Sequence, residues 1–420
     1  MSGLLFSVFA IGLLLGIPIA FAIAIAAIVV LINGNVNLLI VVQRLFAATD
    51  SFPLTAVPFF ILAGDLLARG AISQKLVNFA ESLMGRVRGG LSVVSVVAGM
   101  FFAAISGSGA ATTAAVGATL IPELKKRGYK EDSSTALIAS AGCIGVVIPP
   151  SVPMVLYAVV ADQSVTQLFK NGFLPGLMMG GILIAISLRQ AYKYNYPEGA
   201  AFSWRNLWAT FKQSIWGLLM PLIILGGIFS GYFTPSEAAA VAVVYSMIVS
   251  MFVYRDLTLK ELGKIMLGSA KTSAIIMIII ACSGVFGWVL ANWKIPEAVA
   301  QAILSISSNK YIVLFLIAII ILIAGIFMET SSAVILLTPV FLPLMRALGV
   351  DLVHFGVIFT VGISIGMITP PVAINLFVGS SITGIPIEQI AKAVWPYLLG
   401  LIVAFLLYIY MPLFIPALLF

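Results

Sequence analysis

The feature that most constrains this chain is a pair of interrupted hydrophobic segments that repeat at a constant spacing of 221 residues. The two copies share a proline, two glycines and a Pro-Pro pair in the same order: Pro122 and Pro343, Gly128 and Gly349, Gly145 and Gly366, and Pro149-Pro150 and Pro370-Pro371. A repeat of broken apolar segments is typical of secondary transporters whose binding site lies near the bilayer midplane. The repeat therefore predicts two related halves that share one site.

Composition places both copies in a membrane. The 420-residue chain is 62% hydrophobic and 9% charged, whereas a soluble globular chain carries about 25% charged residues. At about 20 residues per crossing, the length allows on the order of 10–12 spans and no sizeable soluble domain. We therefore expect an all-α polytopic membrane protein whose first span lies within Met1–Leu31. The sequence has no Walker-type phosphate loop, so ATP is not expected to be its direct energy source.

The charged and reactive residues exclude several function classes. The net charge of +7 fits Lys and Arg in cytoplasmic loops better than a nucleic-acid surface. The single His354 and the two cysteines, Cys143 and Cys282, supply neither a metal cluster nor a nucleophile with its base. We therefore expect no enzyme activity and no cofactor.

Hydropathy divides the chain into two halves, 1–190 and 214–420, joined by an aromatic-rich linker at 191–213 that we expect at the membrane interface. Each half is expected to contain scaffold spans, a re-entrant hairpin and a broken helix. The hairpins are expected at about 90–127 and 311–348, and the broken helices at about 134–160 and 355–382. Two amphipathic stretches ahead of the hairpins, Ser73–Arg86 and Leu257–Lys271, are predicted to be short surface helices.

The charges beside the hairpins indicate how the halves are related. Both flanks of the first hairpin are basic, with Arg86, Arg88, Lys125, Lys126, Arg127 and Lys130. The flanks of the second carry only Lys310 and Arg346. Because cytoplasmic loops are enriched in Lys and Arg, the two hairpins are predicted to enter the membrane from opposite faces, as an inverted-topology repeat.

The first hairpin has a Gly-Ser-rich tip, Ser106-Gly107-Ser108-Gly109, at predicted membrane depth. Unpaired backbone groups cost several kcal/mol each in hydrocarbon, so such a break is tolerated only inside protein or along a polar cavity. Its oxygens suit a hard cation such as Na⁺, and the half-helix that follows would direct its positive end at an anion. A small-residue face for helix packing is the alternative.

The first break runs from Gly142 to Ser151 and contains two consecutive prolines. Prolines lack an amide donor and disfavour helix at the preceding residue, so nearby carbonyls lose their helical partners and become available to Na⁺. A plain proline kink is the alternative.

The second copy supplies a tip from Gly325 to Ser332 and a break from Gly366 to Pro371, followed by Asn375. A carboxylate within a membrane costs roughly 2.5–3.5 kcal/mol on insertion scales, so Glu329 in this tip is predicted to be functional. It could bind a cation, take a proton or accept hydrogen bonds from substrate hydroxyls; a Glu that reaches the lipid interface is the alternative. Asp65 and Glu237 are weaker candidates, and Glu237 is expected to start a helix capped by Thr234 or Ser236.

Five segments together resemble the large membrane subunit of TRAP (tripartite ATP-independent periplasmic) transporters. They are Ala104 to Ser108, Ile121-Pro122 with Gly128-Tyr129, Gly145 to Ser151, Gly231 to Ala239, and Thr369 to Val372. The resemblance spans essentially the whole chain. It implies Na⁺-driven, elevator-type import of an organic acid across the bacterial inner membrane, with a small four-helix membrane subunit and a periplasmic substrate-binding protein. A C4-dicarboxylate, a sialic acid and a sugar acid are all compatible substrates.

The resemblance also implies ligands. One Na⁺ site would involve Ser106, Gly145, Ile148 and Pro150. A second would involve Gly325, Gly366 and Thr369. Substrate would lie between the tips, near Ser108, Ser151, Glu329, Thr330, Ser331 and Asn375. The family often has Ser where Gly109 stands and Asp where Glu329 stands, and Glu reaches one methylene further.

Two other functions remain open. A stand-alone Na⁺/dicarboxylate symporter of similar architecture would need no binding protein. An intramembrane enzyme or a channel is the other alternative, although the matched broken helices suit alternating access better than a continuous pore.

Overall fold

The structure is a computed structural model that describes residues 1–68, 71–199 and 201–414. These residues form helices joined by short turns, and they contain no β-strand beyond an isolated bridge between Arg88 and Glu198. The predicted all-α fold is therefore confirmed. Residue 200 of the predicted linker and residues 415–420 of the predicted second half lie outside the described residues.

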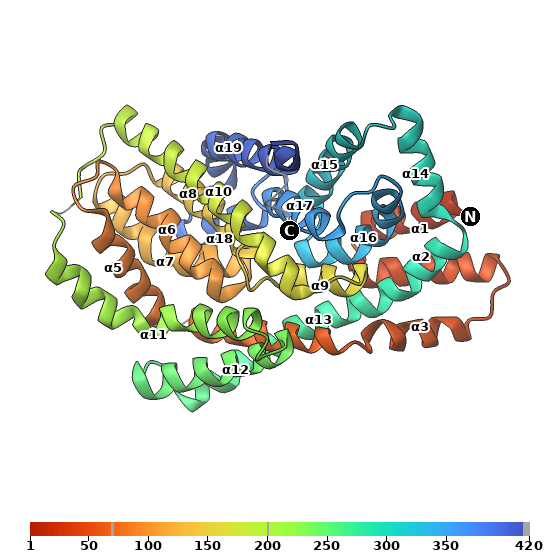
Figure 1. The fold of residues 1–420 in the computed structure, drawn as a ribbon, viewed down its shortest axis with the longest axis horizontal. Helices are drawn as coiled ribbons and strands as arrows, with labels where there is room; N and C mark the ends of the chain where they lie inside the picture. Colours follow the sequence, from red (N-terminus) through yellow and green to blue (C-terminus); the bar gives the residue numbers. More distant parts are fainter. Residues whose placement is uncertain (69–70, 200, 415–420) are drawn as a thin grey trace.

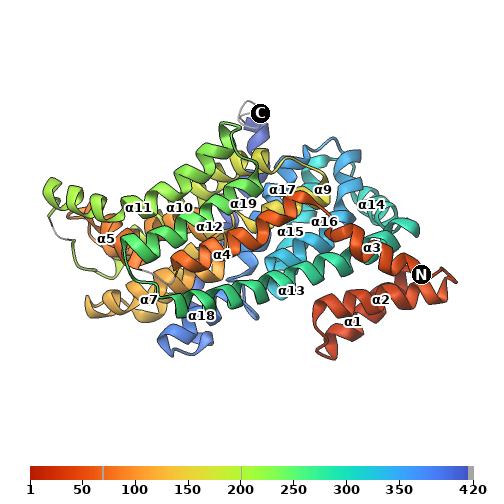
Figure 2. The same ribbon diagram turned by 90° about the horizontal axis from the view of Figure 1, so that it is seen from below.

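The helices lie in two layers (Figures 1 and 2). One, here called the scaffold layer, contains α1 (Ser2–Leu14), α2 (Ile19–Asn33), α3 (Leu39–Thr49), α4 (Ala56–Ala68), α11 (Trp204–Phe229), α12 (Pro235–Ile248) and α13 (Leu259–Asn292). The other, the hairpin layer, contains α6 (Gly90–Ser106), α7 (Gly109–Lys126), α8 (Glu131–Cys143), α9 (Val152–Ala161), α10 (Val165–Lys193), α15 (Lys310–Phe327), α16 (Thr330–Ala347), α17 (Leu352–Gly366), α18 (Ile374–Thr383) and α19 (Ile387–Phe414).

Two helices connect the layers, and each leads into a hairpin. Helix α5 (Ala71–Met84) runs from α4 to α6 and packs against both α6 and α11. Helix α14 (Ile295–Ile306) runs from α13 to α15 and packs against α16. Short helical turns η1 (Phe52–Thr55), η2 (Ile144–Val146) and η3 (Val249–Val253) complete the described elements.

Within the described residues, seven helices are long and apolar enough to cross a membrane, or up to eight if the bent pair Leu39–Thr49 and Phe52–Ala68 counts as one span. This number is lower than the 10–12 spans that length alone allows. The difference arises because several apolar segments are short helices, among them Val152–Ala161, Leu352–Gly366 and Ile374–Thr383.

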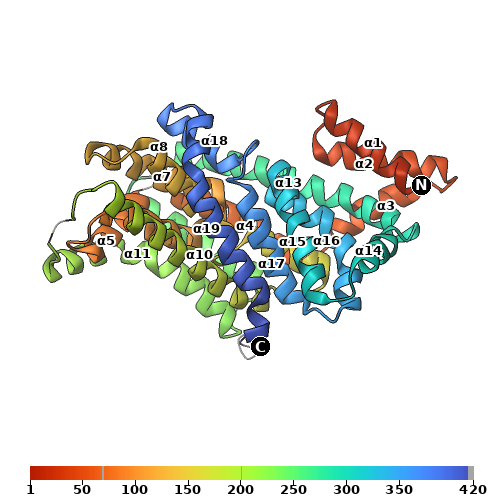
Figure 3. The ribbon, with the colours of Figure 1, turned by 90° about the horizontal axis from the view of Figure 1, so that it is seen from above.

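Both hairpins and both broken helices are present, and Figure 3 shows the second hairpin, α15 and α16, with α17 and α18 of the second broken helix. The first tip lies between the end of α6 at Ser106 and the start of α7 at Gly109, and the second between Phe327 of α15 and Thr330 of α16. The first break separates α8 from α9, and the second separates α17 from α18. The peptide bond within each Pro-Pro pair is cis.

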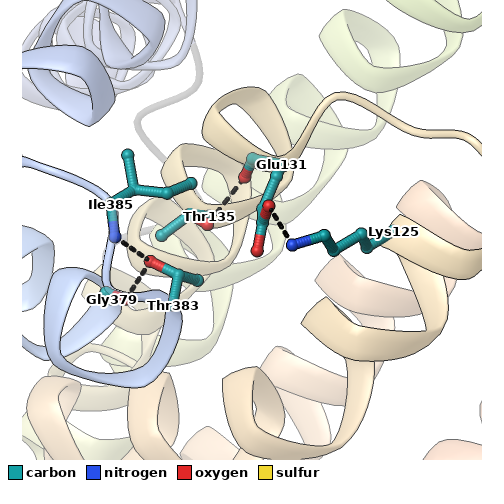
Figure 4. Close-up of polar contacts among 6 residues, drawn as sticks. All are labelled: Lys125, Glu131, Thr135, Gly379, Thr383 and Ile385. Atoms are coloured by element: carbon teal, nitrogen blue, oxygen red, sulfur yellow. Dashed lines mark hydrogen bonds and ion pairs between the residues drawn. The ribbon is translucent and has the colours of Figure 1, made fainter.

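The broken helix of the second half packs directly on the first half. Figure 4 shows the end of α18, where Thr383 bonds to Gly379 and Ile385, beside the start of α8, where Thr135 donates to the carbonyl of Glu131 at 2.7 Å. A Cβ added at Gly379 would lie 2.6 Å from Cγ2 of Thr135, so the two helices meet at a glycine. Next to this contact, Glu131 pairs with Lys125 of α7 at 2.7 Å.

The prediction of a surface helix at Leu257–Lys271 is wrong. From Leu259 on, those residues belong to the 34-residue helix α13, whose start has a capping box between Thr258 and Glu261 and which continues into the predicted span. No proline interrupts the sequence from 259 to 292, so the helix has no reason to end near Lys271. The stretch at Ser73–Arg86 does form a separate helix, α5.

Candidate functional site

A cavity of about 230 Å³ lies between the two layers, where both hairpin tips face the scaffold layer. Its scaffold wall comes from α4 and α13, with Ile61, Gly64, Asp65, Thr272 and Ile276. Its other wall comes from the hairpin layer, with Ser106, Gly107, Ser108, Gly109, Ala111, Val146, Val152, Pro153, Glu329, Ser331 and Met367. Two carboxylates and several hydroxyls line this space, and none of these lining residues is Lys, Arg or His.

The first tip is a tight, hydroxyl-lined turn. Gly107 ends α6 with a positive φ of 60°, a conformation that favours glycine. Ser108 is the N-cap of α7 and accepts a long hydrogen bond of 3.4 Å from the amide of Ala111. The hydroxyls of Ser106 and Thr112 lie 2.8 Å apart, and both residues are buried. The tip therefore gathers oxygen atoms without any charge.

The first break packs against this tip. A Cβ added at Gly107 would lie 2.8 Å from the carbonyl oxygen of Pro150. A Cβ added at Gly145 would lie 2.6 Å from Oγ1 of Thr112 and 2.8 Å from the carbonyl oxygen of Ser108. The structure thus brings Ser106, Gly145 and Pro150 of the first implied Na⁺ site together.

Ile148 and Thr112 also lie at this first cluster. The side chain of Ile148 turns toward α10, where a Cβ at Gly176 would lie 2.4 Å from its Cγ1. Ile148 can therefore offer an ion only its backbone. Thr112 was not predicted as a site residue, although it belongs to the same polar element as the first tip and lies one turn into α7.

The second tip and break also meet. A Cβ at Gly366 would lie 2.2 Å from the carbonyl carbon of Gly325, so these two backbones are in direct contact. The hydroxyl of Thr369 donates to the carbonyl of Ile365 at 2.9 Å. The three residues implied for the second Na⁺ site therefore lie in one local cluster. Only glycine fits where the backbones of Gly325 and Gly366 touch.

The second tip carries a charge that caps its own helix. Glu329 is the N-cap of α16, and its carboxylate accepts hydrogen bonds from the amides of Ser331 at 2.9 Å and Ser332 at 3.2 Å. The Ser331 hydroxyl also donates to it, at 3.1 Å. Glu329 is exposed and lines the cavity, whereas Thr330 is buried with its hydroxyl 3.4 Å from Sδ of Met367. The amides at this helix start are thus already occupied by a carboxylate.

Two residues expected near substrate lie behind the cavity. Ser151 is fully buried and caps α9, with its hydroxyl donating to the carbonyl of Val146. Asn375 is also fully buried, and its Nδ2 donates to the carbonyl of Ala139 at 3.1 Å. Asn375 therefore ties α18 to α8, and neither side chain is among those that line the cavity.

The two halves meet at the start of α7. A Cβ at Gly109 would lie 3.0 Å from the carbonyl oxygen of Gly142 and 3.0 Å from Sδ of Met367. The first tip is therefore closed in by residues from both breaks. A larger side chain at this position would press on both Met367 and the backbone of Gly142.

The scaffold contributes one charged group and one close contact. Asp65 of α4 lines the cavity and accepts a hydrogen bond of 2.6 Å from the hydroxyl of Ser269 on α13. A Cβ at the adjacent Gly64 would lie 2.9 Å from the carbonyl oxygen of Ser106. Glu237, by contrast, forms the expected capping box with Thr234 at the start of α12, away from the cavity.

A larger cavity, of about 330 Å³, lies between α5, α6 and α11. It surrounds the ion pair of Glu81 with Arg127 at 2.8 Å and contains none of the predicted site residues. Among the described residues, no group of three or more His, Cys, Asp or Glu side chains could hold a metal ion.

Comparison with known proteins gives consistent matches. The family model described as "Tripartite ATP-independent periplasmic transporter, DctM component" matches residues 6–414. The C4-dicarboxylate TRAP transporter large permease protein DctM of Pseudomonas aeruginosa is 41% identical over 88% of this chain and 86% of that protein. The 2,3-diketo-L-gulonate TRAP transporter large permease protein YiaN of Escherichia coli is 35% identical over 96% of this chain and 95% of that protein.

Two further matches differ in length or in sequence. The isethionate TRAP transporter permease protein DctMQ of Oleidesulfovibrio alaskensis is 40% identical over 97% of this chain, which spans 65% of that protein. Among solved structures, the YdaH transporter of Alcanivorax borkumensis, reported to have an unusual topology, matches with a TM-score of 0.64. That match covers 90% of this chain and 88% of YdaH at 14% identity, so it concerns the fold alone.

Proposed function

The chain belongs to the family of DctM components of tripartite ATP-independent periplasmic transporters, and from this premise we propose that it carries out Na⁺-coupled import of a small organic acid. Its family members are permeases and not enzymes, and they lie in the bacterial inner membrane. The named relatives transport C4-dicarboxylates, 2,3-diketo-L-gulonate and isethionate according to their names.

The observation that carries this proposal is the convergence of both tips and both breaks around one cavity between the two layers. The oxygens of Ser106, Thr112 and Ser108 meet the first break, and Thr369 lies in the matching cluster of the second. Hydroxyl and carbonyl oxygens are the ligands that hard cations prefer. Each cluster is thus a proposed Na⁺ site, and each orders a stretch of backbone that helix hydrogen bonds leave free.

The acid group of the substrate is proposed to lie at the start of α7. Helix N-termini attract anions because their first amides are unpaired and the helix dipole is positive there. Ser108 leaves this end uncharged, whereas Glu329 already occupies the equivalent end of α16. Na⁺ bound beside Ser106 would add positive charge close to the same place, so cation and anion binding would reinforce each other.

Transport is proposed to follow an elevator mechanism. The hairpin layer carries substrate and Na⁺, while the scaffold layer stays in place. The close contact between Gly64 of α4 and Ser106 of the tip lies on the surface along which the layers would slide. The inverted relationship of the two halves belongs to the same proposal and rests on the charges that flank the hairpins.

The family also implies partners. We propose a small four-helix membrane subunit and a periplasmic binding protein that delivers the substrate. A stand-alone Na⁺/dicarboxylate symporter, which would need no binding protein, is the second candidate.

The test is uptake of labelled organic acid into proteoliposomes that contain this chain and its small subunit. Uptake that requires both an inward Na⁺ gradient and the binding protein supports the tripartite importer. Na⁺-driven uptake without the binding protein favours the stand-alone symporter. Uptake that is unchanged when choline replaces Na⁺ would show that Na⁺ is not the coupling ion. Ser106→Ala and Thr369→Ala should each weaken the Na⁺ dependence of uptake.

A further inference from the structure

The scaffold wall of the cavity contains one charged side chain, Asp65 of α4. The other scaffold residues that line the cavity are Ile61, Gly64, Thr272 and Ile276. A half-buried carboxylate on a membrane-spanning scaffold is costly, so its presence calls for a role. Capping does not supply one, because Asp65 lies in the last turn of α4, where the helix dipole is negative.

The carboxylate of Asp65 is held in place but only partly satisfied. Its Oδ2 accepts the 2.6 Å hydrogen bond from Ser269 on α13, and this is its one side-chain partner within the part of the chain that the structure describes. A carboxylate can accept about four hydrogen bonds. Asp65 therefore has acceptor capacity left on the side that lines the cavity.

The neighbouring Gly64 fixes where this carboxylate stands relative to the first tip. Its close approach to the backbone of Ser106 brings α4 against the tip, and Asp65 follows directly in the helix. Across the cavity, Glu329 presents a second carboxylate, and no lining residue is cationic. The start of α7 thus offers unpaired helix amides to the cavity, while Asp65 and Glu329 offer only hydrogen-bond acceptors.

We propose that Asp65, together with Glu329, selects the substrate: an acid with one carboxylate and several hydroxyl or amino groups is favoured over a dicarboxylate. This inference rests on the proposed function. The single acid group lies at the start of α7, and the hydroxyl or amino groups donate hydrogen bonds to Asp65 and Glu329. A second carboxylate in place of those groups would meet two like charges in a confined space, where charges interact more strongly than in water.

The experiment measures binding directly, so that the choice made by a binding protein does not enter. The purified complex of the full chain with its small subunit is titrated with D-gluconate and with succinate, each in NaCl and in choline chloride. The readout is the dissociation constant from calorimetry, with ligand protection against thermal unfolding as a second measure. The wild type is expected to bind gluconate more tightly than succinate, in NaCl only.

Asp65→Asn is the decisive variant, since Asn keeps the shape and can still bond to Ser269. Removing one of the two opposing charges is expected to lower the preference for gluconate over succinate by about tenfold. Asp50→Asn is the control and should keep the wild-type preference, since it removes an exposed carboxylate that does not line the cavity.

The possible results distinguish the role of Asp65 from the Na⁺-coupled transport on which it rests. An unchanged preference in Asp65→Asn, with Na⁺-dependent binding intact, overturns the role of Asp65 and leaves Na⁺-coupled transport standing. A wild type that prefers succinate overturns the substrate class. A wild type that binds neither acid more tightly in NaCl than in choline chloride contradicts the proposed function itself. Should Asp65→Asn fail to fold, Asp65→Glu, which retains the charge, should retain the preference.

Discussion

The two hairpin tips occupy equivalent places in the repeat but differ in charge. The first tip ends α6 and starts α7 with Ser108, whose single hydroxyl makes one long bond to the helix start. The second starts α16 with Glu329, whose carboxylate accepts from two amides and one hydroxyl. One helix start is therefore open to an anion, and the other is already neutralised.

The two tips therefore share one architecture but present different side chains to the cavity. Both tips close against a broken helix through glycine contacts, at Gly145 in the first copy and Gly366 in the second. The shared part explains why the glycines and prolines repeat in register. The unshared part is Ser108 against Glu329, which leaves the first helix start uncharged and places a carboxylate at the second.

The largest effect is expected from making the first tip resemble the second. Ser108→Glu would place a carboxylate over the amides at the start of α7, where the acid group of the substrate is proposed to bind. The affinity for D-gluconate should fall at least a hundredfold, because the new carboxylate both occupies the amides and repels the anion. Calorimetry on the purified complex measures this, and Ser108→Gln controls for size. Retained affinity in Ser108→Glu would mean that the two tips are not electrostatically distinct.

A smaller effect is expected from adding a methyl group where tip and break touch. Gly366→Ala would place Cβ 2.2 Å from the carbonyl carbon of Gly325, and overpacking of this kind costs roughly 1–3 kcal/mol. Gly145→Ala meets the Thr112 hydroxyl at 2.6 Å and the carbonyl oxygen of Ser108 at 2.8 Å, so it should be less harmful than Gly366→Ala, where the nearest backbone atom lies at 2.2 Å.

Thermal unfolding of the purified protein measures both changes. Gly268→Ala is the matched control, since a Cβ there meets nothing within 4 Å and the residue lies inside α13. If Gly366→Ala were as stable as Gly268→Ala, the close packing of the second cluster would be wrong.

A moderate effect on Na⁺ should separate the two proposed ion sites. Ser106→Ala removes a hydroxyl that lies 2.8 Å from that of Thr112, and Thr369→Ala removes a hydroxyl from the cluster of the second copy. Each should raise the Na⁺ concentration for half-maximal uptake by roughly fivefold to tenfold, the loss expected for one hydrogen-bond-strength ligand. Thr119→Ala, on the same helix as Thr112 but outside the cavity, should leave it unchanged. If Ser106→Ala and Thr369→Ala kept the Na⁺ dependence of Thr119→Ala, neither cluster would be a Na⁺ site.

The smallest expected effect is on helix stability. Glu329→Ala should cost about 1–2 kcal/mol, since it removes a charged cap with two amide partners. Ser108→Ala should cost less than about 1 kcal/mol, because its bond to Ala111 is long at 3.4 Å. Hydrogen exchange at the first amides of α16 and α7 measures the loss of protection in each variant. Equal losses in the two variants would show that the two caps do not differ in strength.

The sequence predicted the tips and breaks well because their signals are local. Gly-Ser clusters and Pro-Pro pairs interrupt helices wherever they occur, and the fixed spacing allowed one copy to support the other. The start of α12 at Thr234 and Glu237 was predicted for the same reason, since a capping box depends on only four consecutive residues.

What the sequence missed depends on contacts between distant segments. Asp65 was only a weak candidate, because nothing near it shows that α4 meets the first tip at Gly64. Asn375 follows the second break closely, yet its side chain bonds back to α8. Leu257–Lys271 looked like a separate surface helix because its amphipathic pattern says nothing about where the helix ends.

The most direct test of the account is an experimental map of the complex, with its small subunit, bound to Na⁺ and D-gluconate. The account predicts that the gluconate carboxylate lies within hydrogen-bond distance of the first amides of α7, with its hydroxyls toward Asp65 and Glu329. A carboxylate found beside Glu329 at the start of α16, with hydroxyls toward α7, would contradict it.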